Sequence, residues 1–161
     1  MVIDMRSYLK SGNYADVFAV GGIAYKLFKS GPDVPPRQTK EGRRRVFESQ
    51  CKAFRLAPLD PFLRCHTAEF HGVQILDDVI DADGKSIQGS YLLDCCYAIE
   101  LFGVDEIDIK ATDERVRGYE YINKALQRFQ ELGINTSDSS VFRHNDPERF
   151  KFIDIEMKDG H

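Results

Sequence analysis

The chain has 161 residues, of which 42% are hydrophobic and 30% charged, and its formal net charge is −4. This length suits one domain or two small lobes, and the negative charge argues against nucleic acid or an anionic membrane as a partner. No apolar run approaches the about 18 residues of a membrane span. The N-terminus lacks an apolar signal core, and the four cysteines form no C-x-x-C pair, so we expect a cytoplasmic protein with reduced thiols.

The first pattern along the chain is a small-residue turn followed by two apolar runs, over residues 11–26. Gly12 and Ala15 in the turn let a backbone approach phosphate groups closely. A Gly-Gly pair separates the two runs and predicts a β-hairpin, and we expect one further strand before the turn. The second run ends in Lys26, a cation that a neighbouring strand can hold against the same phosphates.

The next predicted element is a helix. Residues 31–37 are rich in proline and predict a loop, whereas apolar residues recur at helical spacing over residues 38–56. We interpret the arginine run at 43–45 as a solvated helix face, with attraction of an acidic partner as the alternative. Pro58 and Pro61 are predicted to end this helix.

Two further strands are predicted over residues 68–76 and 89–96, with a turn at residues 81–84. This turn contains Asp-Gly, the dipeptide favoured in hairpins. Its aspartates do not match the spacing of a calcium-binding EF-hand loop, so we interpret the segment as a plain turn. The second strand is followed by an apolar run that ends near residue 102.

The C-terminal third begins with charged residues, 105–117, which predict a loop or a short helix. Residues 116–132 predict a helix with one apolar face, and Gly133 suits its C-terminal cap. Beyond it the chain carries Asp138 and then Asp154, the latter directly after an apolar run. The intervening His144-Asn145-Asp146 is interpreted as a turn between two strands.

These features, in this order, resemble the protein kinase family. Residues 10–17 are similar to its glycine-rich loop, with Lys10 and Ala15 in place of two of the three glycines, and residues 23–26 (Ile-Ala-Tyr-Lys) resemble its V-A-I-K signature. Thr-Ser-Asp at 136–138 stands at the H-R-D position, and Asp-Ile-Glu at 154–156 stands at the D-F-G position.

The resemblance implies an α+β fold. Residues 1–101 would form a kinase-like N-lobe, an antiparallel sheet with one helix, ending in a hinge that holds the adenine ring. Residues 102–161 would form a much reduced helical C-lobe. Because the chain stops soon after Asp154, we expect a minimal or atypical member, or a pseudokinase, that lacks the activation segment and the later C-lobe helices.

The resemblance also implies ATP and Mg²⁺ as cofactors, because phosphoryl transfer depends on positioning and on neutralising charge. Asp138 would be the catalytic carboxylate that receives the proton of the attacking hydroxyl, together with Lys26 as a catalytic cation. Asp154 would hold the magnesium. The partner of Lys26 on the helix is predicted to be Glu48, with Gln50 as the alternative. The expected nucleotide-binding residues are Gly12, Asn13, Ala15, Val17, Lys26 and Glu48.

Three functions are compatible with this pattern. The first is a phosphotransferase that uses ATP on a protein or small-molecule hydroxyl. The second is an inactive pseudokinase that acts as a protein-interaction module, since Arg143 stands where the family has a magnesium-binding asparagine. The third is a structural or inhibitory partner of another enzyme. Some bacterial effector kinases are similarly reduced, so delivery into a host cell stays open beside the cytoplasm.

Overall fold

A computed structural model describes residues 1–31, 39–103, 106–136, 140–143 and 146–158. The chain divides into two units. Unit 1 contains Met1–Glu48 and Phe70–Leu101, and unit 2 contains Ser49–Glu69 and Phe102–His161. Unit 2 therefore includes a segment from the middle of the chain as well as the C-terminal residues.

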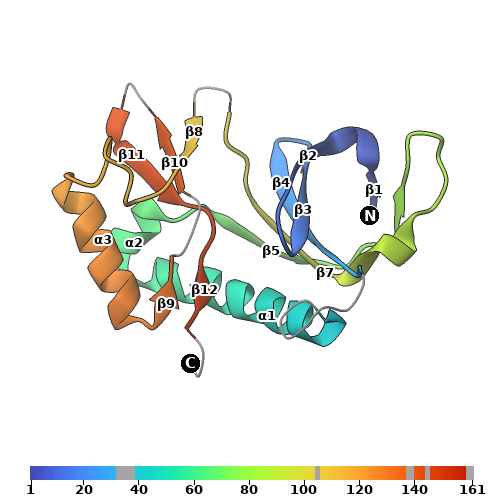
Figure 1. The fold of residues 1–161 in the computed structure, drawn as a ribbon, viewed down its shortest axis with the longest axis horizontal. Helices are drawn as coiled ribbons and strands as arrows, with labels where there is room; N and C mark the ends of the chain where they lie inside the picture. Colours follow the sequence, from blue (N-terminus) through green and yellow to red (C-terminus); the bar gives the residue numbers. More distant parts are fainter. Residues whose placement is uncertain (32–38, 104–105, 137–139, 144–145, 159–161) are drawn as a thin grey trace. The chain divides into compact units, whose positions relative to one another are not determined.

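Unit 1 is built on a five-stranded antiparallel sheet (Figure 1). Its spatial order is β2-β3-β4-β7-β5. The strands are β2 (Tyr8–Ser11), β3 (Ala15–Val20), β4 (Ile23–Lys29), β5 (Phe70–Gln74) and β7 (Tyr91–Glu100). The predicted hairpin is confirmed, because Val20 pairs with Ile23 and the intervening Gly21 and Gly22 have φ values of 57° and 78°. The mixed α+β class is confirmed as well, whereas the kinase-like N-lobe stays a prediction.

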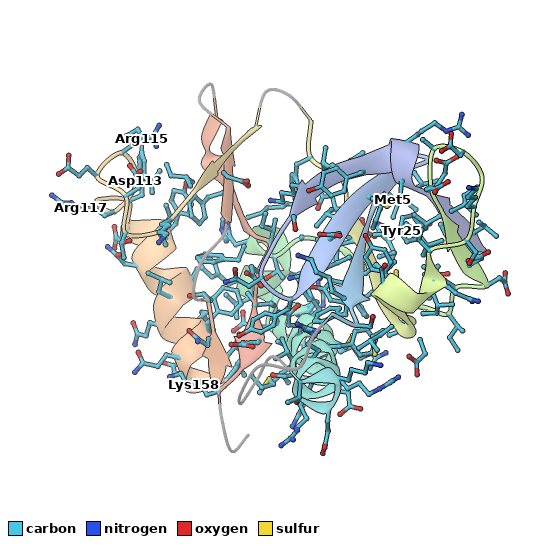
Figure 2. All side chains as sticks on the ribbon, turned by 45° about the vertical axis from the view of Figure 1, so that its right-hand side comes forward. Met5, Tyr25, Asp113, Arg115, Arg117 and Lys158 are labelled. Atoms are coloured by element: carbon cyan, nitrogen blue, oxygen red, sulfur yellow. The ribbon has the colours of Figure 1, made fainter. Side chains whose placement is uncertain are left out.

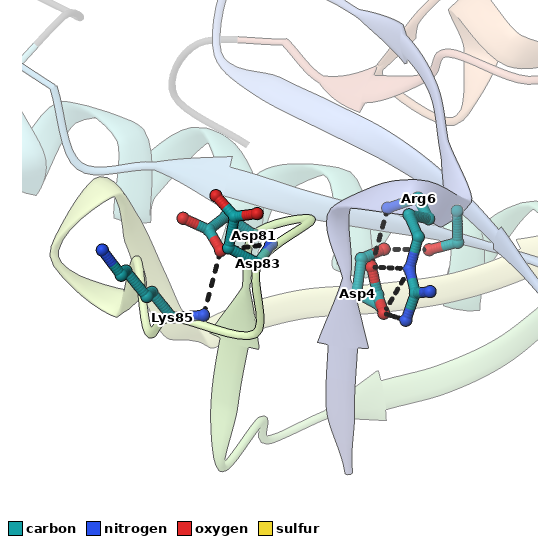
Figure 3. Close-up of polar contacts among 6 residues, drawn as sticks. Asp4, Arg6, Asp81, Asp83 and Lys85 are labelled. Atoms are coloured by element: carbon teal, nitrogen blue, oxygen red, sulfur yellow. Dashed lines mark hydrogen bonds and ion pairs between the residues drawn. The ribbon is translucent and has the colours of Figure 1, made fainter.

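A small parallel pair lies beside this sheet in unit 1. It joins β1 (Val2–Asp4) to β6 (Asp78–Ile80), two strands that the sequence patterns did not separate from their surroundings. Asp4 caps the 3₁₀ turn Met5–Ser7, since its carboxylate accepts from the backbone N–H and the guanidinium of Arg6 (Figure 3). Three-residue strands carry too little pattern to be recognised alone.

The predicted plain turn at residues 81–84 is confirmed. The carboxylate of Asp81 accepts hydrogen bonds from the backbone N–H groups of Asp83 and Lys85, each at 2.9 Å (Figure 3). Gly84 adopts a φ of 78°, a conformation that L side chains rarely adopt. The Asp81 carboxylate therefore satisfies the turn's own backbone.

Alternate residues of a strand point to opposite faces of the sheet. In unit 1 both faces of the sheet carry buried side chains. One face forms a cluster against which Met5 and Tyr25 also pack (Figure 2): Ile3, Phe18, Leu27, Leu76, Val79, Tyr91 and Cys96. On the other face Phe28 and Tyr97 pack against Phe47 of α1 (Lys40–Leu56), with ring centroids 5.5 and 6.3 Å from that of Phe47.

The arginine run at the start of α1 corrects one expectation. Arg44 and Arg45 are exposed as predicted, but Arg43 is only 4% exposed. Its guanidinium donates to the backbone oxygens of Lys29 and Gly31, at 3.2 and 3.4 Å. Two carbonyls at and just beyond the end of β4 thus bind one cation of the run in the interior, a contact that charge patterning along the helix does not reveal.

The described residues of unit 2 form two complete α-helices and two small antiparallel sheets, ordered β11-β10-β8 and β12-β9. The described elements, besides the C-terminal part of α1, are α2 (Pro61–His66), β8 (Glu106–Ile109), α3 (Glu120–Glu131), β9 (Ile134–Asn135), β10 (Ser140–Arg143), β11 (Asp146–Phe152) and β12 (Glu156–Met157). β10 and β11 pair antiparallel. Of the turn predicted at 144–146, residues 144–145 lie outside the described residues and Asp146 is the first residue of β11.

Three boundaries in unit 2 differ from the sequence prediction. Pro61 begins α2, because the Asp60 carboxylate caps the N–H groups of Phe62 and Leu63 and proline suits the first helical position. The charged segment before α3 contains the strand β8, which depends on pairing with the distant β10. Finally, α3 begins at Glu120 rather than at residue 116, while Gly133, with a φ of 72°, follows it as the predicted cap.

No described helix is long and apolar enough to cross a membrane. The four cysteines, Cys51, Cys65, Cys95 and Cys96, are free thiols as predicted.

Asp60 supports both helices of unit 2, since its second carboxylate oxygen accepts from Arg128 of α3 at 2.7 Å. We expect Asp60→Ala to lower the free energy of unfolding by about 1–2 kcal/mol, and Asp60→Asn, which keeps the cap, to cost less. Burial raises the pKa of Asp60, but the hydrogen bonds from Leu63, Phe62 and Arg128 together lower it by more. The pKa of Asp60 therefore lies below its ordinary value of 3.8. The contribution is thus present above about pH 4 and lost as the pH falls through the folded-state pKa.

Urea unfolding of the three proteins at pH 7 and pH 3 measures both effects. Equal stability of Asp60→Ala and the wild type at pH 7 would contradict this role of Asp60.

Candidate functional site

The loop between β2 and β3 is a tight turn. The backbone N–H of Gly12 donates to the carbonyl oxygen of Ala15 at 2.8 Å, and Ser11 pairs with Asp16 across the two strands. A Cβ atom added at Gly12 would lie 3.4 Å from that oxygen, an ordinary van der Waals contact. The N–H of Gly12 is therefore used inside the turn and does not point at a ligand in this conformation.

Lys26 lies in the middle of β4, between Val17 of β3 and Tyr97 of β7. Its ammonium is 5.9 Å from the ring centroids of both Phe28 and Tyr97. Both rings are fully buried, so the cation is held against their faces by a cation–π interaction. The structure thus brings two predicted site residues, Val17 and Lys26, side by side in the sheet.

The two candidate partners of Lys26 on α1 differ in exposure. Glu48 is exposed and lies one helical turn beyond Arg44, whose guanidinium binds Asp94 at 2.6 Å. The charge of Glu48 also affects the buried thiol of Cys95. The pKa of this thiol is raised to about 12, chiefly by burial, and the negative charges of Asp94 and Glu48 also raise it. Gln50, by contrast, is only 4% exposed. The Lys26–Glu48 pair stays a prediction.

Asp154 lies in unit 2, between the end of β11 and the start of β12. The side-chain amide of Gln50 donates to its Oδ1 at 3.5 Å. The neighbouring Ser49 hydroxyl accepts from the backbone N–H of Met157 at 2.9 Å and donates to its carbonyl at 3.3 Å. Two consecutive residues of α1 thus hold the segment that carries Asp154.

The same segment is also fixed by strand pairing. Met157 of β12 pairs with Ile134 of β9, and the N–H of Lys158 donates to the carbonyl of Gly133 at 2.8 Å. Asp154 is therefore placed by contacts from α1 and by the β9–β12 pair. Ser49 was missed by the sequence reasoning, because a serine within a helix carries no signal of a distant backbone partner.

The predicted catalytic residue Asp138 lies outside the described residues, as do His144 and Asn145. Arg143 is the last residue of β10 and pairs with Glu106 of β8. Of the remaining predicted residues, Asn13 stands in the turn between β2 and β3, and Ala15 is the first residue of β3 and is buried. The predicted role of Asp138 stays a prediction.

A magnesium site would have to be built around Asp154. Within the described ranges, no three or more His, Cys, Asp or Glu side chains form a group that could hold a metal ion. Mg²⁺ in nucleotide sites is commonly held by one or two carboxylates together with phosphate oxygens and waters. The magnesium role of Asp154 stays a prediction.

A buried polar cluster, missed by the sequence reasoning, lies under the loop of unit 1. We call it the Asp16 cluster: Asp16, Ser11, Lys29 and Tyr91. Asp16 is 8% exposed, and its carboxylate accepts from the Tyr91 and Ser11 hydroxyls at 2.7 and 2.6 Å. The ammonium of Lys29 lies 3.4 Å from the same carboxylate. The only sequence signal was a polar residue among the buried positions of a strand.

Comparisons with protein-family models, with curated proteins and with solved structures found no match. The function proposed below therefore rests on the residues and geometry of this chain and on the resemblance of its motifs.

Removing the Tyr91 hydroxyl tests the Asp16 cluster. We expect Tyr91→Phe to lower the free energy of unfolding by about 1–3 kcal/mol at pH 7, because a buried carboxylate oxygen loses a donor. Burial, followed by the bond to Asp16, raises the pKa of Tyr91 above its ordinary 10.0. The wild type should therefore lose stability above about pH 10, as the unfolded tyrosine ionises first, and the variant should lose less.

Unfolding by guanidinium at pH 7 and pH 11 measures this difference. Parallel loss of stability in both proteins between the two pH values would argue against a buried, hydrogen-bonded Tyr91.

Proposed function

We propose that the chain is a reduced kinase-like phosphotransferase, which uses ATP and Mg²⁺ to phosphorylate a hydroxyl of a protein or a small molecule. The observation that carries the proposal is the contact of Gln50 with Asp154 at 3.5 Å. Within unit 2, a buried polar side chain of α1 thus contacts the aspartate that stands at the D-F-G position. An unrelated α+β domain gives no reason for that pairing.

The order of the elements supports the same proposal. In unit 1 the loop, the lysine strand β4 and α1 follow one another before β5 and β7 complete the sheet. In unit 2 the long helix α3 precedes β9, the antiparallel pair β10–β11 and then Asp154. The kinase resemblance implies this succession: a long helix, a catalytic segment, a short strand pair and the metal-binding aspartate.

The proposed chemistry assigns one task to each charged residue. Lys26 binds phosphate oxygens, and the rings of Phe28 and Tyr97 restrict where its ammonium lies. Asp154 holds Mg²⁺, which when bound neutralises charge on the phosphates. Asp138 is assigned to the proton of the attacking hydroxyl. Most of the rate enhancement in phosphoryl transfer comes from positioning and electrostatics, so few residues suffice.

A nucleotide-binding pseudokinase is the second candidate, and one observation favours it. The Gly12 N–H donates within the turn rather than toward a ligand, and Lys10 and Ala15 replace two loop glycines. A loop of this kind can cover a nucleotide without aligning its terminal phosphate for transfer. This candidate predicts ATP binding without turnover.

Nucleotide binding is tested with one variant in each unit and a matched control for each. We expect Lys26→Met to weaken ATP binding by about tenfold or more, since it removes a phosphate partner. Asp154→Asn should abolish the Mg²⁺-dependent part of the affinity and leave metal-free binding intact. Lys85→Met and Asp83→Asn, in the exposed turn of Figure 3, are expected to bind as the wild type does.

Thermal-shift titration and calorimetry with ATP, with and without Mg²⁺, measure these affinities. At 100-fold excess of ligand over Kd the folded state gains about 2.7 kcal/mol. No shift of the wild type at millimolar ATP would refute both candidates. Radiolabelled ATP then separates them: turnover that Asp154→Asn abolishes supports the phosphotransferase, and binding without turnover supports the pseudokinase.

Gln50 provides a finer test of how Asp154 is held. We expect Gln50→Leu to raise the Kd for Mg²⁺–ATP by about three- to tenfold without changing metal-free ATP binding, because the carboxylate loses the amide that orients it. Gln127→Leu, on the exposed face of α3, is the matched control. An equal change in metal-free and Mg²⁺-dependent binding would show that Gln50 acts on the fold and not on Asp154.

A further inference from the structure

Lys29, the last residue of β4, binds the loop between β2 and β3 with its side chain. Its ammonium donates to the Ser11 hydroxyl and to the carbonyl of Gly12, both at 2.7 Å. Its own backbone N–H donates to the carbonyl of Tyr14 at 2.9 Å. Lys29 therefore bonds three residues of the loop, Ser11, Gly12 and Tyr14.

The position of Lys29 in the strand separates it from Lys26. Residues three apart in a strand point to opposite faces, so Lys29 lies on the face of Asp16 and Tyr91, whereas Lys26 lies over Phe28 and Tyr97. The pairing of β4 with β7 is irregular between Leu27 and Lys29, and such bulges re-aim side chains. The two lysines thus have different surroundings and are not interchangeable.

The Asp16 carboxylate keeps the Lys29 ammonium in place. It lies 3.4 Å from that ammonium, and the Tyr91 and Ser11 hydroxyls bind its oxygens. The Lys29 side chain is 29% exposed, and that of Asp16 is 12% exposed. Hydrogen bonds to both members of this partly exposed charge pair favour one geometry over alternatives.

This contact has a direct effect on the peptide between Gly12 and Asn13. In a trans peptide the C=O and N–H groups point in opposite directions. Because the Gly12 carbonyl points to the Lys29 ammonium, the N–H of Asn13 points away from it. Asn13 is one of the residues expected to contact nucleotide, and an oriented backbone N–H is a suitable partner for a phosphate oxygen.

We propose that Lys29 is a positioning residue, which holds the loop in one shape and presents the Asn13 N–H to a phosphate group of the nucleotide. The ligand in this inference rests on the proposed function, while the ordering of the loop does not. A loop already ordered before binding loses less conformational entropy when the ligand arrives, and affinity rises accordingly. Lys29 does not itself bind the phosphate, because its ammonium is engaged by Asp16 and by the loop.

Three variants test the inference. Lys29→Met removes the ammonium and keeps most of the side chain, and Lys29→Arg restores a donor cation. Asp60→Ala, in unit 2, is a destabilised control that leaves the loop and its contacts unchanged. The Gly12 amide donates to the Ala15 carbonyl across the turn. Its rate of hydrogen exchange therefore measures how well the loop is ordered in the absence of nucleotide. Calorimetry with ATP measures affinity, and Ser11→Ala serves as a milder variant if Lys29→Met does not fold.

We expect exchange at Gly12 to become about tenfold faster in Lys29→Met, with a similar loss of ATP affinity, and both to recover largely in Lys29→Arg. Asp60→Ala should lose stability while its exchange at Gly12 and its ATP affinity stay within about twofold of the wild type. Unchanged exchange at Gly12 in Lys29→Met, or in Ser11→Ala if that is the variant used, overturns the positioning role.

Faster exchange with unchanged ATP affinity overturns the link to the ligand. A wild type that fails to bind ATP refutes the proposed function and the ligand assigned here, and the exchange result then still decides whether Lys29 orders the loop.

Discussion

The packing of Phe47 against Phe28 and Tyr97 is the contact on which unit 1 depends. It fixes α1 on one face of the five-stranded sheet, with ring centroids 5.5 and 6.3 Å apart from that of Phe47. Aromatic rings of this size bury a large apolar area and prefer defined mutual orientations. The Phe28 and Tyr97 rings also form the surface over which the Lys26 ammonium lies, so the placement of the cation follows from the packing of the core.

The polar contacts that concern function are few and local. Lys29 and Asp16 define the shape of the loop in unit 1, and Ser49 and Gln50 hold the Asp154 segment in unit 2. In both places a buried or half-buried side chain bonds a backbone group or a carboxylate. Such arrangements hold functional atoms in position when their own partners are satisfied. These contacts favour a protein in which the loop and Asp154 are ordered before any ligand binds.

The proposed phosphotransferase and the pseudokinase differ in a small number of atoms. Both proposals assign nucleotide binding to Lys26 and Asp154. The turn bond of Gly12 lowers the resemblance to an active kinase. The fixed placement of Asp154 between β11 and β12 raises it, because a magnesium ligand must be held in position.

The sequence by itself determined the elements that depend on local chemistry. The Gly21–Gly22 hairpin, the Asp81 turn, α1 and the cap at Gly133 follow from backbone freedom, side-chain capping and helical periodicity. Only the tertiary structure decided the elements whose partners lie far away in the chain. The strand β8 forms because it pairs with β10, and Arg43 is buried because carbonyls at the end of β4 accept from it. The same holds for the candidate site. Lys26 and Asp154 were recognisable as motif positions, whereas Lys29, Asp16 and Ser49 acquire their roles from contacts that residue spacing does not encode.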